Sequence, residues 1–292
     1  MSTALAYGFI CMASVMFGTQ FIFQQRYSKK EGTTVNGAMR FSFFVSLFQI
    51  PFLFILPADE PISFTLPAAA ICLVSSVNSI LNAYFCVKVF ERADMTLFSI
   101  FEMLGGMTLP FIGGMLFFGE PPTAPKFIGF ALIALSLFLE TGKFSRIDKR
   151  SLFYYFSLFI TNGLSGVFAK WNQTLENGVS GNSFIMISSI WTLIICGVCL
   201  LVQKFAMKKS IGFTSPKNAF ISIIPYVVIA TLGSVFLLTA LEVLPASVQY
   251  PMSTGGTIVV SVIISTIRRE KLKVQNYIAA VIAVISAVVI AL

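Results

Sequence analysis

The 292-residue sequence contains no histidine and few charged residues. Without histidine it lacks the commonest general base and zinc ligand of proteins, which excludes Ser-His-Asp and Cys-His catalytic sites. Only 11% of its residues are charged, whereas soluble domains carry about 25%. Because 57% of the residues are apolar, a water-soluble chain of this size could not bury its apolar surface. We therefore expect an all-α membrane protein.

The cysteines and glycines also argue against several functions. The five cysteines all lie inside apolar runs, which argues against a secreted disulfide framework. Cys196 and Cys199 have the CxxC spacing, but no second pair and no histidine accompanies them, so we expect no metal site. A glycine-rich phosphate-binding loop is missing as well, which excludes an ATPase within the chain. The sequence predicts no cofactor and no enzymatic activity.

The apolar residues gather in runs long enough to cross a lipid bilayer. A spanning helix needs about 20 mostly apolar residues. The links between the runs are short and leave no room for a soluble domain. The sequence therefore predicts ten transmembrane helices, at residues 3–25, 35–57, 66–90, 95–118, 123–142, 151–172, 181–203, 217–241, 245–267 and 272–292.

The distribution of basic residues predicts the orientation. Of the 20 Lys and Arg residues, 17 lie in or beside the links that follow the odd-numbered spans, and the links after even-numbered spans hold only Lys126. Basic links face the cytoplasm in membrane proteins. We expect a multi-pass protein of the cell (inner) membrane with both termini on the outer side. The net charge of +8 then reflects orientation, and we expect no nucleic-acid partner.

The sequence contains a weak internal repeat. Gly105-Gly106 recurs 150 positions later as Gly255-Gly256, and Glu120 recurs in the same way as Glu270. Five predicted spans lie in residues 1–150 and five in residues 151–292. Because five is odd, the two repeats must cross the membrane in opposite senses. Inverted repeats of this kind are typical of secondary transporters, whose substrate sites lie near the membrane midplane between the repeats.

Short motifs connect the chain to a known family. The sequence Ala-Met-Arg-Phe at residues 38–41 and the pair Gly119-Glu120, together with the five-plus-five spans, resemble the drug/metabolite transporter superfamily, EamA-type. The resemblance covers essentially the whole chain and implies a carrier for small organic metabolites. EamA-type carriers usually keep both termini in the cytoplasm, whereas the basic links here predict the reverse. Small multidrug members use a glutamate in the first helix, where this chain has Gln20.

Glu102 is the strongest candidate for a functional residue. It lies about a third of the way along the fourth predicted span, between apolar neighbours. A charge at bilayer depth costs roughly 2.5–3.5 kcal/mol on insertion scales, and intramembrane carboxylates mark functional sites by default. Glu102 could bind a proton, a cationic substrate or both in competition. A structural hydrogen bond or salt bridge is the alternative interpretation.

Other polar residues within the spans have two interpretations each. Asn78 and Asn82 share one polar helix face and could either tie helices together or line a wet cavity. Arg40 and Lys170 lie near span ends, where they could snorkel or pack, or they could contact a substrate. The candidates for substrate or proton binding are Glu102, Asn78, Asn82, Gln20, Arg40, Tyr84, Lys170, Trp191 and Tyr250.

These features favour a secondary active transporter that moves a small organic solute by alternating access, coupled to protons. An uncoupled facilitator or channel, or a membrane scaffold without transport, is the alternative. The solute could be an amine, an amino acid or a nucleobase-like molecule. We expect the chain to act as a monomer in the lipid bilayer.

Overall fold

The computed structural model describes residues 1–31, 34–56, 61–90, 95–141, 149–205, 208, 212–267, 269 and 272–291. These residues form ten α-helices and no strand. Glu270, the predicted counterpart of Glu120, and parts of the basic links lie outside the described residues. The helices are α1 (Thr3–Glu31), α2 (Val35–Ile55), α3 (Leu66–Phe90), α4 (Met95–Phe117), α5 (Ala124–Thr141), α6 (Lys149–Thr174), α7 (Gly181–Phe205), α8 (Pro216–Leu241), α9 (Ala246–Ile267) and α10 (Val274–Ala291).

Eight of the described helices are long and apolar enough to cross a membrane, which fits the prediction of an all-α membrane protein. The described apolar parts of α4 and α5 are shorter, at Phe101–Phe117 and Ala124–Leu139. Most helix bounds agree with the predicted spans to within a few residues. The exception is α1, which continues as a helix to Glu31 although the apolar run ends near residue 25.

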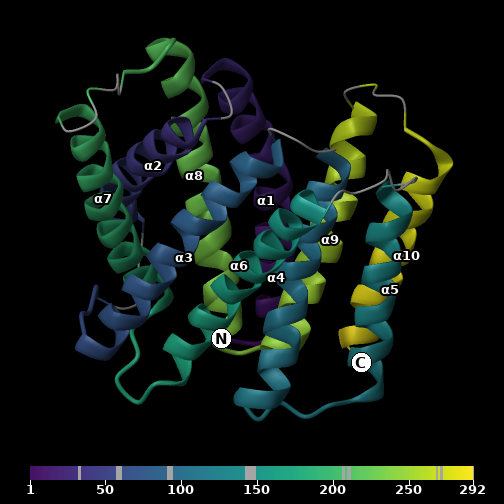
Figure 1. The fold of residues 1–292 in the computed structure, drawn as a ribbon. Coiled ribbons are helices and arrows are strands. Elements are labelled where there is room, and N and C mark those ends of the chain that lie inside the picture. Colours follow the sequence, from purple (N-terminus) through teal and green to yellow (C-terminus); the bar gives the residue numbers. More distant parts are fainter. Residues whose placement is uncertain are drawn as a thin grey trace.

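The helices pack as a bundle with two distinct edges (Figure 1). Helices α2 and α7 lie together at one edge, and α5 and α10 lie together at the other. Between them, α1 packs along α8 and α9, while α6 packs along α3 and α4. Both chain termini lie at one end of the bundle, which we call the terminal end. The helices α1, α3, α5, α7 and α9 end at the opposite end of the bundle, which we call the basic end.

Serine side chains hold α5 and α10 together in a reciprocal arrangement. The Ser136 hydroxyl on α5 donates a hydrogen bond to the Ala279 carbonyl oxygen on α10, at 2.7 Å. The Ser286 hydroxyl on α10 donates in turn to the Gly129 carbonyl oxygen on α5, at 2.6 Å. Both serines are fully buried. Small residues let the two backbones approach closely enough for these bonds to form in an apolar setting.

A buried glutamate caps the first turn of α9. The carboxylate of Glu120, just after α4, accepts hydrogen bonds from the backbone N–H groups of Ala246 at 2.6 Å and Ser247 at 2.8 Å. The first N–H groups of a helix have no partner within the helix, and the positive end of the helix dipole attracts a negative charge. The cap therefore fixes α9 to the α4–α5 link at the terminal end.

A second glutamate makes an equivalent cap at the basic end. The carboxylate of Glu31, the last residue of α1, accepts hydrogen bonds from the backbone N–H groups of Thr214 and Ser215, both at 2.8 Å. These residues immediately precede α8. Glu31 and Glu120 thus each join residues before position 151 to a helix that follows it.

Candidate functional site

Glu102 lies on α4, about a third of the way along the helix. Its side chain is partly buried, and the Cys86 thiol on α3 and the Tyr226 phenol on α8 lie within the range of its charge. Within the part of the chain that the structure describes, neither carboxyl oxygen has a hydrogen-bond or ion-pair partner. Both oxygens nevertheless keep accessible surface.

The backbone of Glu102 is held in place by close contact between α4 and α6. The side-chain amide of Asn162 on α6 donates a hydrogen bond to the Glu102 carbonyl oxygen, at 2.6 Å. Beside it, a Cβ atom added to Gly163 would lie only 2.5 Å from the Gly105 carbonyl oxygen. The two glycines therefore allow the helix backbones to touch, and this contact fixes α4 against α6 beside Glu102.

Tyr226 is a further polar residue within the range of the Glu102 charge, although the sequence analysis did not select it. Its ring packs edge-on against Phe41 of α2, with centroids 4.8 Å apart. Its hydroxyl keeps accessible surface and has no hydrogen-bond partner among the described residues. A phenol hydroxyl directly after Pro225, in the middle of an apolar run, was the sequence signal that could have identified it.

The two asparagines of α3 tie that helix to α6. The Asn78 amide donates hydrogen bonds to the Thr161 carbonyl oxygen at 2.7 Å and to the Ser165 hydroxyl at 3.1 Å. The Asn82 amide donates to the Thr161 hydroxyl, at 3.1 Å. Its carbonyl oxygen accepts from the Cys86 thiol, 3.5 Å away. These bonds favour the structural interpretation for Asn78, whereas Asn82 also positions the thiol that neighbours Glu102.

The two basic candidates lie apart from Glu102. Arg40 is buried, and its guanidinium donates a hydrogen bond to the Gly212 carbonyl oxygen and lies over the Phe213 ring, 5.4 Å from its centroid. It therefore packs inside the protein and does not extend to the lipid headgroups. The Lys170 ammonium donates to the carbonyl oxygen of Leu241, the last residue of α8, at 3.4 Å. This bond satisfies a carbonyl group at the negative end of that helix.

The remaining candidates are spread over the bundle. Gln20 on α1 is partly exposed, and Trp191 on α7 packs against a buried apolar cluster. The Tyr250 hydroxyl donates to the Gly166 carbonyl oxygen, at 3.2 Å. Among the described residues, no three metal-ligating side chains gather in one place. The structure thus brings Asn82, but none of these three residues, into a described chain of contacts with Glu102.

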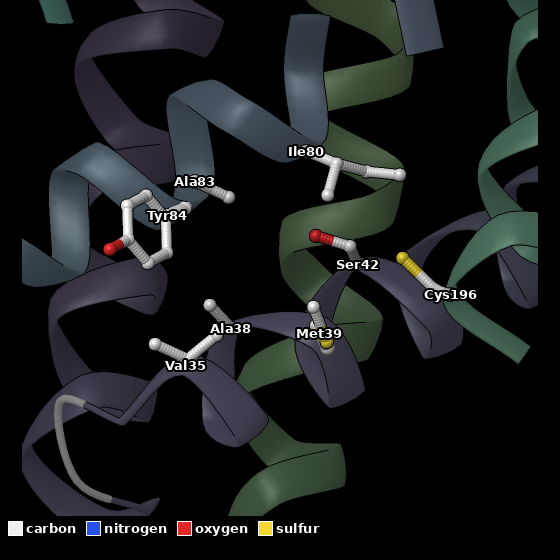
Figure 2. A pocket seen from close by; sticks show the side chains of 8 residues that line it. All are labelled: Val35, Ala38, Met39, Ser42, Ile80, Ala83, Tyr84 and Cys196. Atoms are coloured by element: carbon white, nitrogen blue, oxygen red, sulfur yellow. The ribbon is translucent and has the colours of Figure 1, made fainter. Parts of the chain in front are cut away.

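Tyr84 lines a separate pocket between α2, α3 and α7 (Figure 2). The pocket is small, with a cavity volume of about 10 Å³, and has mostly apolar walls, with the Ser42 and Tyr84 hydroxyls as its oxygen-bearing groups. It is formed by the first half of α2 and the second half of α3, so it lies toward the basic end. Its lining residues are Val35, Ala38, Met39, Ser42, Ile80, Ala83, Tyr84 and Cys196.

Comparisons with known proteins identify the fold but no family. No family model and no curated protein matches the sequence. The fold does match solved structures. In one crystal structure the match covers 99% of this chain and 96% of that chain, with a TM-score of 0.74 at 10% sequence identity. A likeness at this level of identity shows a shared fold and does not carry a function.

Proposed function

We propose that the chain is a secondary active transporter of the drug/metabolite superfamily, EamA-type, that moves a small organic solute in exchange for protons. The observation that carries the proposal is the carboxyl group of Glu102, which is partly buried, accessible and without a partner among the described residues. Such a group inside a membrane protein is costly. We expect a buried carboxyl group where it repeatedly gains and loses a proton or a ligand. A membrane scaffold does not require such a group.

The reciprocal contacts of α5 and α10 support an inverted repeat. Ser286 and Ala279 lie 150 positions after Ser136 and Gly129, respectively. Ser136 donates to Ala279, the counterpart of Gly129, and Ser286, the counterpart of Ser136, donates to Gly129 itself. Contacts that are exchanged in this way are typical of a two-fold axis. They support the division into residues 1–150 and 151–292.

A second pair of contacts joins corresponding helices, although its bonded residues are not 150 positions apart. Asn162 of α6 packs on Gly106 and donates to the Glu102 carbonyl oxygen of α4. Ser14 of α1 packs on Gly256 and donates to the Ser253 carbonyl oxygen of α9, at 3.3 Å. In both cases, the first helix of one proposed repeat bonds to the fourth helix of the other. The bond lies beside Gly106 in one case and beside Gly256 in the other. This match supports ten spans arranged as two inverted five-helix repeats.

This arrangement suits alternating access. Glu102 belongs to the first proposed repeat and Asn162, which bonds to its backbone, to the second, so Glu102 lies where the repeats meet. Rocking of one repeat against the other would expose this region to each side of the membrane in turn. Chemical conversion of the solute is not part of the proposal.

Replacing Glu102 with glutamine tests the coupling. The E102Q variant is expected to fold normally, because the carboxyl group makes no hydrogen bond that the amide would break. It should lose pH-driven transport, since the amide cannot exchange a proton. Purified protein in liposomes with a pH-sensitive dye would be screened with amines, amino acids and nucleobases for solute-driven proton flux.

The matched control is E176Q, which changes an exposed glutamate in the α6–α7 link and should leave proton flux unchanged. Unaltered proton coupling in E102Q would remove Glu102 from the mechanism. Concentration of the solute against its gradient would distinguish a carrier from a channel, because a channel only equilibrates it.

We also propose that the protein lies in the cell membrane with its basic end in the cytoplasm. Single cysteines would replace Ser2, near the terminal end, and Lys273, at the basic end, in a C11S background that removes an exposed native thiol. A membrane-impermeant maleimide applied to intact cells should label S2C and spare K273C until the membrane is opened. The opposite labelling pattern would reverse the proposed orientation.

A further inference from the structure

We infer that residues 212–215, which we call the strap, close the basic end of the bundle, and that Glu31 and Arg40, which we call the latch, release the strap when this end opens. The strap directly precedes α8 and belongs to the second proposed repeat, whereas α1 and α2, which carry the latch, belong to the first. The inference rests on the proposed function, because alternating access requires the repeats to part at each end of the bundle in turn.

The first argument is that the acid and the base of the latch both hold the backbone of the strap. The Glu31 carboxylate accepts hydrogen bonds from the N–H groups of Thr214 and Ser215, both at 2.8 Å. The Arg40 guanidinium donates to the Gly212 carbonyl oxygen. Glu31 and Arg40 are both buried, so little water screens these bonds. The latch therefore fixes the course of the strap across the ends of the two repeats.

The second argument is that one side chain anchors the strap. The Phe213 ring packs on Phe44 of α2 and Phe220 of α8, with centroids 5.0 and 5.6 Å away, and edge-on to Tyr27 of α1 at 6.5 Å. The Arg40 guanidinium lies 5.4 Å from the centroid of the same ring. The strap itself is not helical. Its release would therefore withdraw one aromatic ring from the contacts between three helices and unfold none of them.

The third argument is that the strap separates an acid from a base. Among the described residues neither Glu31 nor Arg40 forms an ion pair, and the buried Arg40 Nε has no hydrogen-bond partner. The latch binds backbone groups of residues 212 and 214, whose Cα atoms are at most about 7 Å apart. Both charges also lie within range of the Tyr27 phenol. When the strap leaves, the carboxylate and the guanidinium can pair with each other, which avoids two unpaired buried charges. The latch thus has two states.

The fourth argument is the comparison with the equivalent link of the first proposed repeat. Residues 62–65 lie 150 positions before the strap, and they also cross to the second repeat, at the terminal end. The Ser63 N–H donates to the Ser183 hydroxyl at 3.0 Å, and the Thr65 hydroxyl donates to the Asn177 carbonyl oxygen at 2.6 Å. Neither bond involves a charged group. The charged latch is therefore a feature of the basic end, where it adds a second state to the contact.

Hydrogen exchange of the purified full-length protein in detergent micelles, followed by mass spectrometry, tests the latch. Two pairs of N–H groups are compared, each bound by a buried glutamate: Thr214 and Ser215 in the strap, and Ala246 and Ser247 under Glu120. After correction for intrinsic rates, the strap pair should exchange at least about tenfold faster, because the strap opens locally while the bundle stays folded. Equal protection of the two pairs would show a static cap and overturn the inference.

Three variants test the two states of the latch. E31Q removes the charge and one acceptor, so the strap should exchange about tenfold faster than in the wild type. The charge swap E31R/R40E reverses both contacts with the strap and keeps an acid–base pair, so it should release the strap. E31R alone places two positive charges together, so its Tm should lie below that of the swap. The matched control E176Q changes an exposed acid and should exchange as the wild type does. Thermal unfolding would show that each variant is folded.

Unchanged strap exchange in folded E31Q would overturn the inference, and a swap that unfolds no later than E31R would remove the paired state from the latch. The measurement uses no solute and no pH gradient. Release of the strap without solute-driven proton flux in the wild type would therefore contradict the proposed carrier and leave the latch intact. Proton flux in a protein whose strap is as protected as the Glu120 cap would contradict the latch alone.

Discussion

The G105A variant is expected to lose much of the stability of the helix bundle. A Cβ atom at position 105 would overlap the Phe159 carbonyl oxygen of α6 and lie within 2.7 Å of the adjacent backbone carbons. Backbone atoms cannot turn away as a side chain can, so α4 and α6 must separate. Overpacking of a core costs about 1–3 kcal/mol, and we expect the upper end of that range here.

Thermal unfolding of the purified protein in detergent would measure the effect. A loss of about 3 kcal/mol should lower the Tm of G105A by about 10 °C. The control is G255A, at the equivalent position of the second repeat, where the nearest atom to an added Cβ is 3.4 Å away. G8A is a second control, because nothing lies within 4 Å of its added Cβ. Equal Tm values for G105A and G255A would contradict the close approach of α4 and α6.

These two glycine pairs show what the sequence could and could not predict. The apolar runs predicted the helices because a bilayer requires long apolar segments, and such segments can be recognised from neighbouring residues in the sequence. The repeat of Gly105-Gly106 at positions 255 and 256 was visible in the same way. The difference in the space around Gly105 and Gly255 was not visible in the sequence, because it depends on which helix packs against each glycine pair.

Partners distant in sequence account for the other differences. Arg40 was expected to snorkel, to pack or to contact a substrate, and it packs; its partner, Gly212, lies in a link whose position depends on the packing of α8. Asn78 was equally compatible with a wet cavity until the fold placed Thr161 next to it. In each case the residue type was informative, and the partner required the tertiary fold.

Glu120 illustrates the same limit. Its place after Gly119 identified it as a motif residue and as one mark of the repeat, yet the sequence did not suggest what it binds. Gly119 has a φ of +66°, a conformation that favours glycine. This turn directs the Glu120 carboxylate back along α4 toward the start of α9. The motif is therefore a way to cap a helix that lies more than a hundred residues further along the chain.

The E120Q variant is consequently expected to lower stability strongly with almost no change in volume. The amide offers one acceptor oxygen instead of two, so one of the Ala246 and Ser247 N–H groups loses its partner, and the negative charge at the helix start is removed. Hydrogen bonds to charged groups contribute about 1.5–3 kcal/mol each. We expect the Tm in detergent to fall by about 5–10 °C, while E176Q unfolds as the wild type does.

Two neighbouring glycines provide an independent check of this cap. A Cβ atom at Gly114 would press on the Glu120 carboxyl group, with its carboxyl carbon 2.8 Å away. At Gly113 the nearest atom is 3.4 Å away, which is an ordinary contact. G114A should therefore displace the carboxylate and lower the Tm as E120Q does, and G113A should not. Both substitutions disrupt the same cap, so the Tm of the double variant G114A/E120Q should lie close to that of the less stable single variant. Additive losses would show that Gly114 and Glu120 stabilise the protein separately.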